Sequence, residues 1–152
     1  MVRRTEVWFY HLESTPLERV LPDLLEKTLA KGWRAIVRTA NAERLDYLNA
    51  HLWTYRPDSF LPHGATKDGH GEAQPVYLTT DEDRINDAQA LFLVDGAEPG
   101  DFTPFARCVV IFDGRDAEAT EAARAFWKKA KANGHEVTYW QQSPAGKWEQ
   151  KG

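Results

Sequence analysis

The sequence predicts an α/β fold, in which helices cover both faces of a mostly parallel, doubly wound sheet. Short runs of β-branched and aromatic residues alternate along the chain with longer segments of helical periodicity, an order typical of parallel crossovers. The run CVVIF, residues 108–112, is apolar without a break, as in a strand buried on both faces. A chain of 152 residues, 42% of them hydrophobic, is long enough for one core. We therefore expect a single domain over residues 1–152, with 143–152 as a flexible tail.

Each expected strand is a short apolar run bounded by turn-forming residues. The third one can begin with Pro75, because proline is tolerated at the first residue of a strand. The expected strands are residues 6–12, 33–39, 75–80, 90–96, 108–114 and 135–142.

The first expected helix follows the first strand. Thr15 and Glu18 have the spacing of a capping box, and Pro16 occupies the first helical position, where its missing N–H donor costs nothing. Gly32 marks the end of this helix. Pro22 lies inside the segment and predicts either a kink or a late start.

Two further helices have clear end signals. Asn41 is expected to cap a helix that runs to about Leu52. The last helix is expected from about Asp116 to Asn133, and Gly134 marks its end.

Composition excludes several classes of function. The formal net charge is −4, so no overall positive field attracts the chain to nucleic acid or to an anionic membrane. No run of about 18 apolar residues predicts a transmembrane span, and the N-terminus lacks the pattern of a signal peptide. Cys108 is the single cysteine, which fits a reducing compartment. We expect a cytoplasmic protein that contacts neither a membrane nor nucleic acid directly.

Rossmann-like sheets often bind nucleotides at glycine-rich loops, but the loop here does not fit that role. Gly64 and Gly69 have the spacing of a phosphate-binding loop, yet the required Lys and Ser/Thr are missing and the segment precedes a strand. His63 and His70 lie seven residues apart in the same loop, which is weak spacing for a metal site. We expect no cofactor and no metal.

Two carboxylates keep an enzymatic alternative open. Asp95 and Asp113 are expected at the carboxyl ends of strands, the edge where α/β folds place their active sites. Both residues precede a glycine, and Asp-Gly pairs are also ordinary turn sequences. A nucleotide-binding or hydrolytic enzyme that uses these two side chains is the alternative to a non-catalytic protein.

A basic surface is expected on the last helix. At 100° per residue, Arg124, Lys128 and Lys131 fall on the side opposite the apolar positions, and Trp127 flanks the boundary. Three cations and an indole suit an acidic peptide that carries an apolar anchor. Cations near a helix C-terminus also complement the helix dipole, so a solvated surface is the other explanation of these residues.

The stretch LWTYRPDSFLPHG, which follows the second helix, is unusually aromatic for a loop. It carries Trp53, Tyr55 and Phe60. Pro57 and Pro62 remove backbone donors and favour extended conformations before them. Either the aromatic side chains fold back on the core or they form an apolar platform that a partner covers.

This stretch resembles the chi subunit family of bacterial DNA polymerase III holoenzyme. Members characteristically have a Leu-Trp pair, a short spacer, Ser-Phe-x-Pro-His, a glycine-rich loop and a Pro-Val strand. The matching positions are Leu52-Trp53, SFLPH at residues 59–63, residues 64–73 and Pro75-Val76. The opening strand and the leucine-rich helix ending in KGWR also match, so the resemblance runs from about residue 5 to residue 142.

The resemblance implies a small α/β protein without enzymatic activity in the clamp-loader assembly. Such a protein links the clamp loader to single-stranded-DNA-binding protein by binding that protein's acidic C-terminal tail. The tail-binding positions carry over to Arg124, Trp127 and Lys128, with Trp127 in place of a tyrosine. A further basic position of the family falls on Thr120, and Lys131 is expected to compensate for its loss.

The resemblance also implies a second protein interface. In the family this surface binds the psi subunit, and its aromatic positions carry over to Trp53 and Phe60. We assign Pro57 and Pro62 to the same interface, because they stiffen the loop between and beyond the aromatic residues. A psi-type subunit, or another partner such as a helicase-like protein, is expected to cover it.

Overall fold

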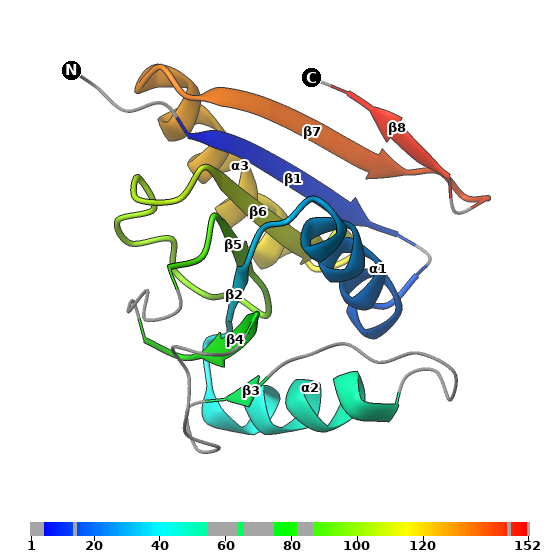
Figure 1. Cartoon of the computed structure of the whole chain (residues 1–152). Helices are drawn as coiled ribbons and strands as arrows, with labels where there is room; N and C mark the ends of the chain where they lie inside the picture. Colours follow the sequence, from blue (N-terminus) through cyan, green and yellow to red (C-terminus); the bar gives the residue numbers. More distant parts are fainter. Residues whose placement is uncertain are drawn as a thin grey trace.

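Strands and helices alternate through most of the chain (Figure 1). The computed structural model describes residues 5–13, 15–54, 64–65, 75–81, 87–145 and 147–151, and all elements lie within these ranges. In chain order they are β1 (Glu6–Leu12), α1 (Leu17–Ala30), β2 (Ala35–Arg38), α2 (Ala42–Thr54), β3 (Gly64–Ala65), β4 (Val76–Thr79), β5 (Ala90–Leu93), β6 (Arg107–Asp113), α3 (Ala117–Ala132), β7 (Glu136–Gln142) and β8 (Trp148–Gln150).

The strands form one sheet in the order β3-β4-β2-β5-β6-β1-β7-β8. Neighbouring strands are parallel except for β7 and β8, which run antiparallel. The helix α1 carries the chain from β1 across to β2, and α3 carries it from β6 across to β7. The predicted mostly parallel sheet is therefore confirmed.

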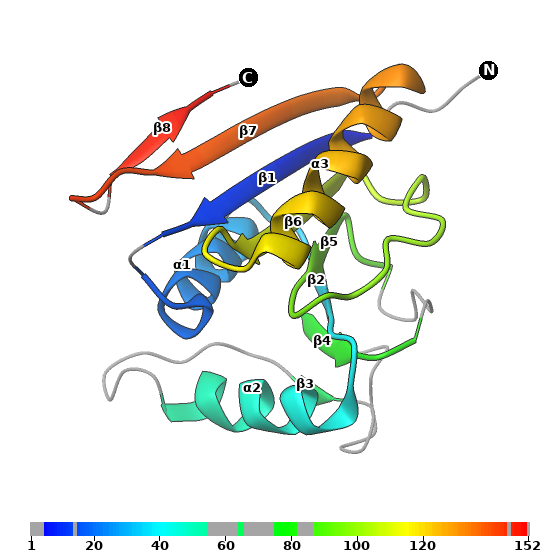
Figure 2. The same ribbon diagram turned by 180° about the vertical axis from the view of Figure 1, so that it is seen from behind.

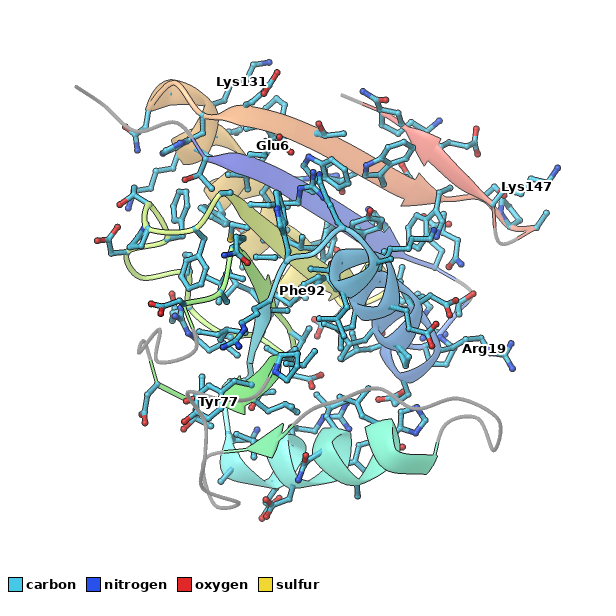
Figure 3. The ribbon with its side chains drawn as sticks, in the orientation of Figure 1. Glu6, Arg19, Tyr77, Phe92, Lys131 and Lys147 are labelled. Atoms are coloured by element: carbon cyan, nitrogen blue, oxygen red, sulfur yellow. The ribbon has the colours of Figure 1, made fainter. Side chains whose placement is uncertain are left out.

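Helices cover both faces of this sheet (Figures 1 and 2). On one face, Leu21 of α1 and Leu48 of α2 are fully buried in a cluster that also contains Phe92, labelled in Figure 3. On the other face, α3 buries Ala123 and Ala130 in a second cluster. The doubly wound arrangement follows from these two separate cores.

The start of α1 differs from the predicted capping box. Pro16 is the N-cap, the first helical residue is Leu17, and no side chain caps the helix. The Thr15 hydroxyl instead accepts a hydrogen bond of 2.6 Å from the side-chain amide of Gln142 on β7. Contact with a neighbouring strand has thus replaced the local cap. Pro22 lies within a continuous α1, so the helix does not start late.

A strand is found where a flexible tail was expected. β8 pairs with β7 and places Trp148 opposite Gln142. The Trp148 ring packs edge-on against Tyr10 of β1, with ring centroids 5.1 Å apart. Because an aromatic side chain of this segment reaches the core, its described residues belong to the sheet.

The carboxyl ends of the parallel strands meet at one edge of the sheet. Leu12 ends β1, Leu93 ends β5 and Asp113 ends β6. The strand β5 is shorter than predicted because Asp95 and Gly96 adopt positive φ angles of 50° and 80°, which turn the chain out of the sheet. At this edge α3 begins, only a short turn after β6.

Candidate functional site

The helix α3 packs one side on the sheet and leaves the other side to solvent (Figure 2). Ala123 and Ala130 are buried, and Phe126 makes edge-on contacts with Phe9 and Phe102 at centroid distances of 5.6 and 5.3 Å. Aromatic pairs at this distance and angle add to the burial of their surface. These contacts determine which residues of α3 face outward.

An open groove of about 650 Å³ follows the outward side of α3. Arg124 and Lys128 lie one helical turn apart on its wall, and both are exposed. Neither cation has an ion-pair partner among the residues that the structure describes. The groove is lined by Gly114, Arg115, Ala117, Thr120, Glu121, Arg124, Ala125 and Lys128. We call it the basic groove, because its lining holds three cations and one carboxylate.

The other two predicted tail-binding residues form a pair beside the basic groove. The Lys131 ammonium lies 4.7 Å from the centroid of the half-buried Trp127 ring, within the range of a cation–π interaction. Lys131 is exposed at the C-terminal end of α3 and points away from the sheet (Figure 3). The Trp127 Nε1 group is buried and has no acceptor in the described part of the chain. The four residues therefore share one side of α3, but only two of them line the groove.

Arg115 is a groove residue that the sequence analysis missed. It is 70% exposed, and its Nε donates to Asp113 Oδ1 over 3.1 Å. This hydrogen bond holds the pKa of Asp113 below its usual value. Its position just after a predicted strand end was the available signal, because that edge is where side chains from separate strands meet.

A histidine and a tyrosine adjoin the basic groove. His11 Nδ1 and the Tyr139 hydroxyl are 2.7 Å apart, and His11 Nε2 is 3.4 Å from Glu13 Oε1. Burial lowers the pKa of His11; Glu13 opposes this shift, and the charge of Arg124 acts in the same direction as burial. Gly114 abuts the imidazole so closely that a Cβ there would collide with it. At neutral pH, Arg124 therefore lies near an uncharged imidazole.

The two strand-end carboxylates line a second cavity, of about 950 Å³, at the carboxyl edge of the sheet. Asp95 Oδ2 accepts a hydrogen bond of 2.9 Å from Arg44 Nε, and Asp113 is bound by Arg115. Arg115 lowers the pKa of Asp113, and a carboxylate with a lowered pKa is a poor general acid. The structure thus brings Asp95 and Asp113 to one cavity, but each already has a cationic partner.

The described ranges lack two further features. They contain no group of three or more His, Cys, Asp or Glu side chains placed to hold a metal ion. They also contain no helix that combines the length and the apolar character required to cross a membrane.

The predicted second interface lies outside the described residues. Pro57, Phe60 and Pro62 fall in the gap between α2 and β3, and only the backbone of Trp53 is described, near the end of α2. The assignment of these four residues to a partner interface stays a prediction.

Comparison with known proteins identifies a family. The model of the family described as "DNA polymerase III chi subunit, HolC" matches residues 4–138. The chain is also similar to a protein of Rickettsia prowazekii (strain Madrid E) named "Probable DNA polymerase III subunit chi". The two are 28% identical over 85 residues, which are 56% of this chain and 52% of that protein. The match thus spans about half the length of this curated relative.

Proposed function

The chain belongs to the DNA polymerase III chi subunit family, and on this basis we propose that it is a non-catalytic adaptor of the polymerase's clamp-loader complex. Family membership supports a replication-associated subunit role. In the proposal, α3 binds the acidic C-terminal tail of single-stranded-DNA-binding protein, and a second surface binds a psi-type subunit. Such an adaptor acts in the bacterial cytoplasm, needs no cofactor and does not contact DNA itself.

The observation that carries the proposal is the pair of unpartnered cations in the basic groove. Arg124 and Lys128 are exposed, one turn apart, and free of ion pairs among the described residues. Carboxylates of a bound tail would provide the partners that the folded chain does not. Charge pairs at a solvent-accessible surface chiefly steer association and depend on ionic strength, so the proposed binding is salt-sensitive.

Trp127 and Lys131 extend this site by one turn toward the C-terminal end of α3. The half-buried indole provides a rigid apolar surface, and Lys131 lies over its ring. An apolar residue of the tail can contact the edge of this indole while its acidic neighbours remain beside the cations. This arrangement fits a short peptide that combines negative charge with one large apolar side chain.

Thr120 marks a departure from the family pattern. It stands in the basic groove where the resemblance implies a further basic residue, and its hydroxyl donates to the Asp116 carbonyl over 2.9 Å. Arg115 lines the same groove, but Asp113 already binds its guanidinium. The groove therefore has fewer free cations than the family pattern implies, and we expect weaker tail binding.

A peptide titration tests the tail site. A fluorescently labelled C-terminal tail peptide of the cognate single-stranded-DNA-binding protein is titrated with the chain at low and at moderate salt. We expect saturable binding that weakens with salt and falls by roughly tenfold or more in Arg124→Ala/Lys128→Ala. Equal binding by the double variant would contradict the assignment of this site.

The neighbouring lysine provides a matched control. Lys129 follows Lys128 directly in α3 but lines the cavity at the carboxyl edge instead of the basic groove. Lys129→Ala removes the same charge from the same helix, so we expect it to leave tail binding nearly unchanged. If Lys128→Ala and Lys129→Ala weakened tail binding to a similar extent, the loss would be due to net charge and not to the position of the lysine.

A second measurement tests the other interface. Purified psi-type subunit is titrated against the chain by calorimetry, with Trp53→Ala and Phe60→Ala as variants. We expect both variants to weaken this binding and to leave tail binding unchanged, because the tail site is built from α3 alone. Tyr47→Ala is the control, since Tyr47 is an exposed aromatic residue of the same helix, 50% exposed.

The enzymatic alternative has less support from the geometry. Asp95 and Asp113 are each bound by an arginine, so both carboxylates already have a cationic partner within the protein. A common nucleotide with magnesium is therefore not expected to raise the melting temperature of the chain.

A further inference from the structure

The flank of α3 that faces away from the basic groove lines the cavity at the carboxyl edge of the sheet, described above. This cavity is larger than the basic groove, and we call it the acidic groove. It has a volume of about 950 Å³ and lies outside the carboxyl ends of β1, β5 and β6, between the starts of α1 and α3. In α/β folds this edge of the sheet is the usual place for a ligand.

One wall of the acidic groove is apolar and spacious. Ala119 and Ala122 of α3 and Phe112 of β6 all line it, and the short alanine side chains leave room beside the helix. Phe126 also lines the groove and is held in place by its edge-on contact with Phe102, at a centroid distance of 5.3 Å. The wall is therefore preformed, because its bulky residues are packed against other rings.

The rim of the same groove is negative. Its lining includes six carboxylates and three cations. Two of these cations are already neutralised, since Arg44 is bound to carboxylates of α1 and the β5 turn and Arg115 to the end of β6. Glu98 and Glu118 are exposed and have no ion-pair partner within the described ranges. An uncompensated negative charge therefore remains at the entrance.

This groove does not suit a phosphate or a nucleotide. The Asp116 carboxylate accepts hydrogen bonds of 3.0 and 3.3 Å from the backbone N–H groups of Glu118 and Ala119. These are the donors that a helix start would otherwise offer to an anion. Two donors at the start of α3 are thus occupied, and the surrounding carboxylates repel a further anion.

From the apolar wall and the negative rim, we propose that the acidic groove binds a cationic amphipathic helix of a partner protein. The apolar side of that helix packs against Ala119, Ala122 and Phe112, and its Lys or Arg residues lie beside Glu98 and Glu118. This interaction goes beyond the adaptor function proposed above. The two grooves on α3 have opposite charge and share only Arg115 and Ala125, so they select partners of opposite charge.

A synthetic peptide tests this proposal on the full chain. The probe is a fluorescein-labelled amphipathic peptide of about 18 residues, or five helical turns, with Leu on one side and Lys on the other. A second peptide has Glu in place of every Lys. We expect saturable one-to-one binding of the Lys peptide that weakens with salt, and no binding of the Glu peptide in this groove.

Two variants locate the site. Glu98→Gln/Glu118→Gln removes the free charges at the rim and should weaken the Lys peptide by roughly fivefold to tenfold. Ala122→Trp fills the groove at an exposed helix position and should abolish binding. Glu121→Gln is the matched control, because it removes the same charge from α3 on the side of the basic groove. If Ala122→Trp does not fold, the two charge variants still decide the question.

The outcomes separate this proposal from the tail site. Arg124→Ala/Lys128→Ala should leave binding of the Lys peptide unchanged, so either site can fail without the other. If the Lys peptide bound the rim variant, Ala122→Trp and the control equally well, its binding would reflect non-specific attraction to net negative charge. That result would overturn the proposal. Displacement of the Lys peptide from the groove by a magnesium nucleotide would also overturn the proposal. A concentration-dependent dimer that Ala122→Trp disrupts would instead assign the groove to a second copy of the chain.

Discussion

The Arg107 guanidinium lies 3.8 Å from the centroid of the Trp8 ring and 5.0 Å from that of Trp33. Its Nη2 also lies 3.0 Å from Glu6 Oε2. Both indoles are only partly buried and pack against the core on the face that α1 covers. The Arg107 side chain of β6 therefore contacts two aromatic rings at the margin of the core. A guanidinium can stack on an indole there and still keep its bond to a carboxylate.

Replacing this cation should destabilise the fold. We expect Arg107→Leu to lower the free energy of unfolding by about 1–2 kcal/mol, because both cation–π contacts and the bond to Glu6 are lost. Urea unfolding measures the change. Arg115→Leu serves as the control, since Arg115 is 70% exposed and lies outside the stack. An equal effect of the two substitutions would contradict the role of the stack.

The close approach of Gly114 and His11 predicts a coupled pair of substitutions. A Cβ on Gly114 would collide with the His11 ring and the Leu12 carbonyl, so Gly114→Ala should cost about 1–3 kcal/mol of stability. In a His11→Ala background the cost should be smaller, because the ring is gone. A double-mutant cycle measures this coupling, and additive costs would contradict the collision with His11.

The lowered pKa of His11 predicts a pH dependence of stability. Burial lowers this pKa in the folded chain, so the unfolded chain takes up the proton more readily. The stability that depends on neutral His11 is fully present above the unfolded pKa of about 6.5 and is lost as the pH falls below it. Between about pH 7.5 and pH 5.5, His11→Gln should therefore lose less stability than the parent chain.

Urea unfolding of the parent chain and of His11→Gln at these two pH values measures the difference. Parallel curves for the parent and His11→Gln would contradict the assignment to His11.

The resemblance to the family predicts a substitution that improves the proposed tail binding. Thr120→Lys adds a cation to the basic groove at the position where the resemblance implies a basic residue. We expect roughly threefold to tenfold tighter binding of the acidic tail peptide, with a steeper dependence on salt. Ala122→Lys is the control, because it adds the same charge to an exposed position on the other flank of α3. Equal gains from both would mean that net charge, not position, sets the affinity.

Patterns along the chain predicted the main elements of the fold. The alternation of apolar runs with helical periodicity identified the longer strands and the three helices of the residues that the structure describes. Asn41 caps α2 as predicted, through a hydrogen bond of 2.8 Å from the Arg44 N–H to its side chain. The capping box at Thr15 was wrong because the Gln142 amide, far away in sequence, binds the same hydroxyl. β8 was missed because its pairing depends on β7 and not on its own short sequence.

For the candidate site, the sequence by itself determined that Arg124, Lys128 and Lys131 share one side of a helix, since a fixed rotation per residue decides this. Only the tertiary structure decided which cations remain free. The fold brings Asp95 to Arg44, and the turn after β6 lets Arg115 bind Asp113, two residues before it. Arg124 and Lys128 have no such partner among the residues that the structure describes. The acidic groove likewise exists only in the folded chain, because its walls come from helix and strand residues that parallel crossovers bring to one edge of the sheet.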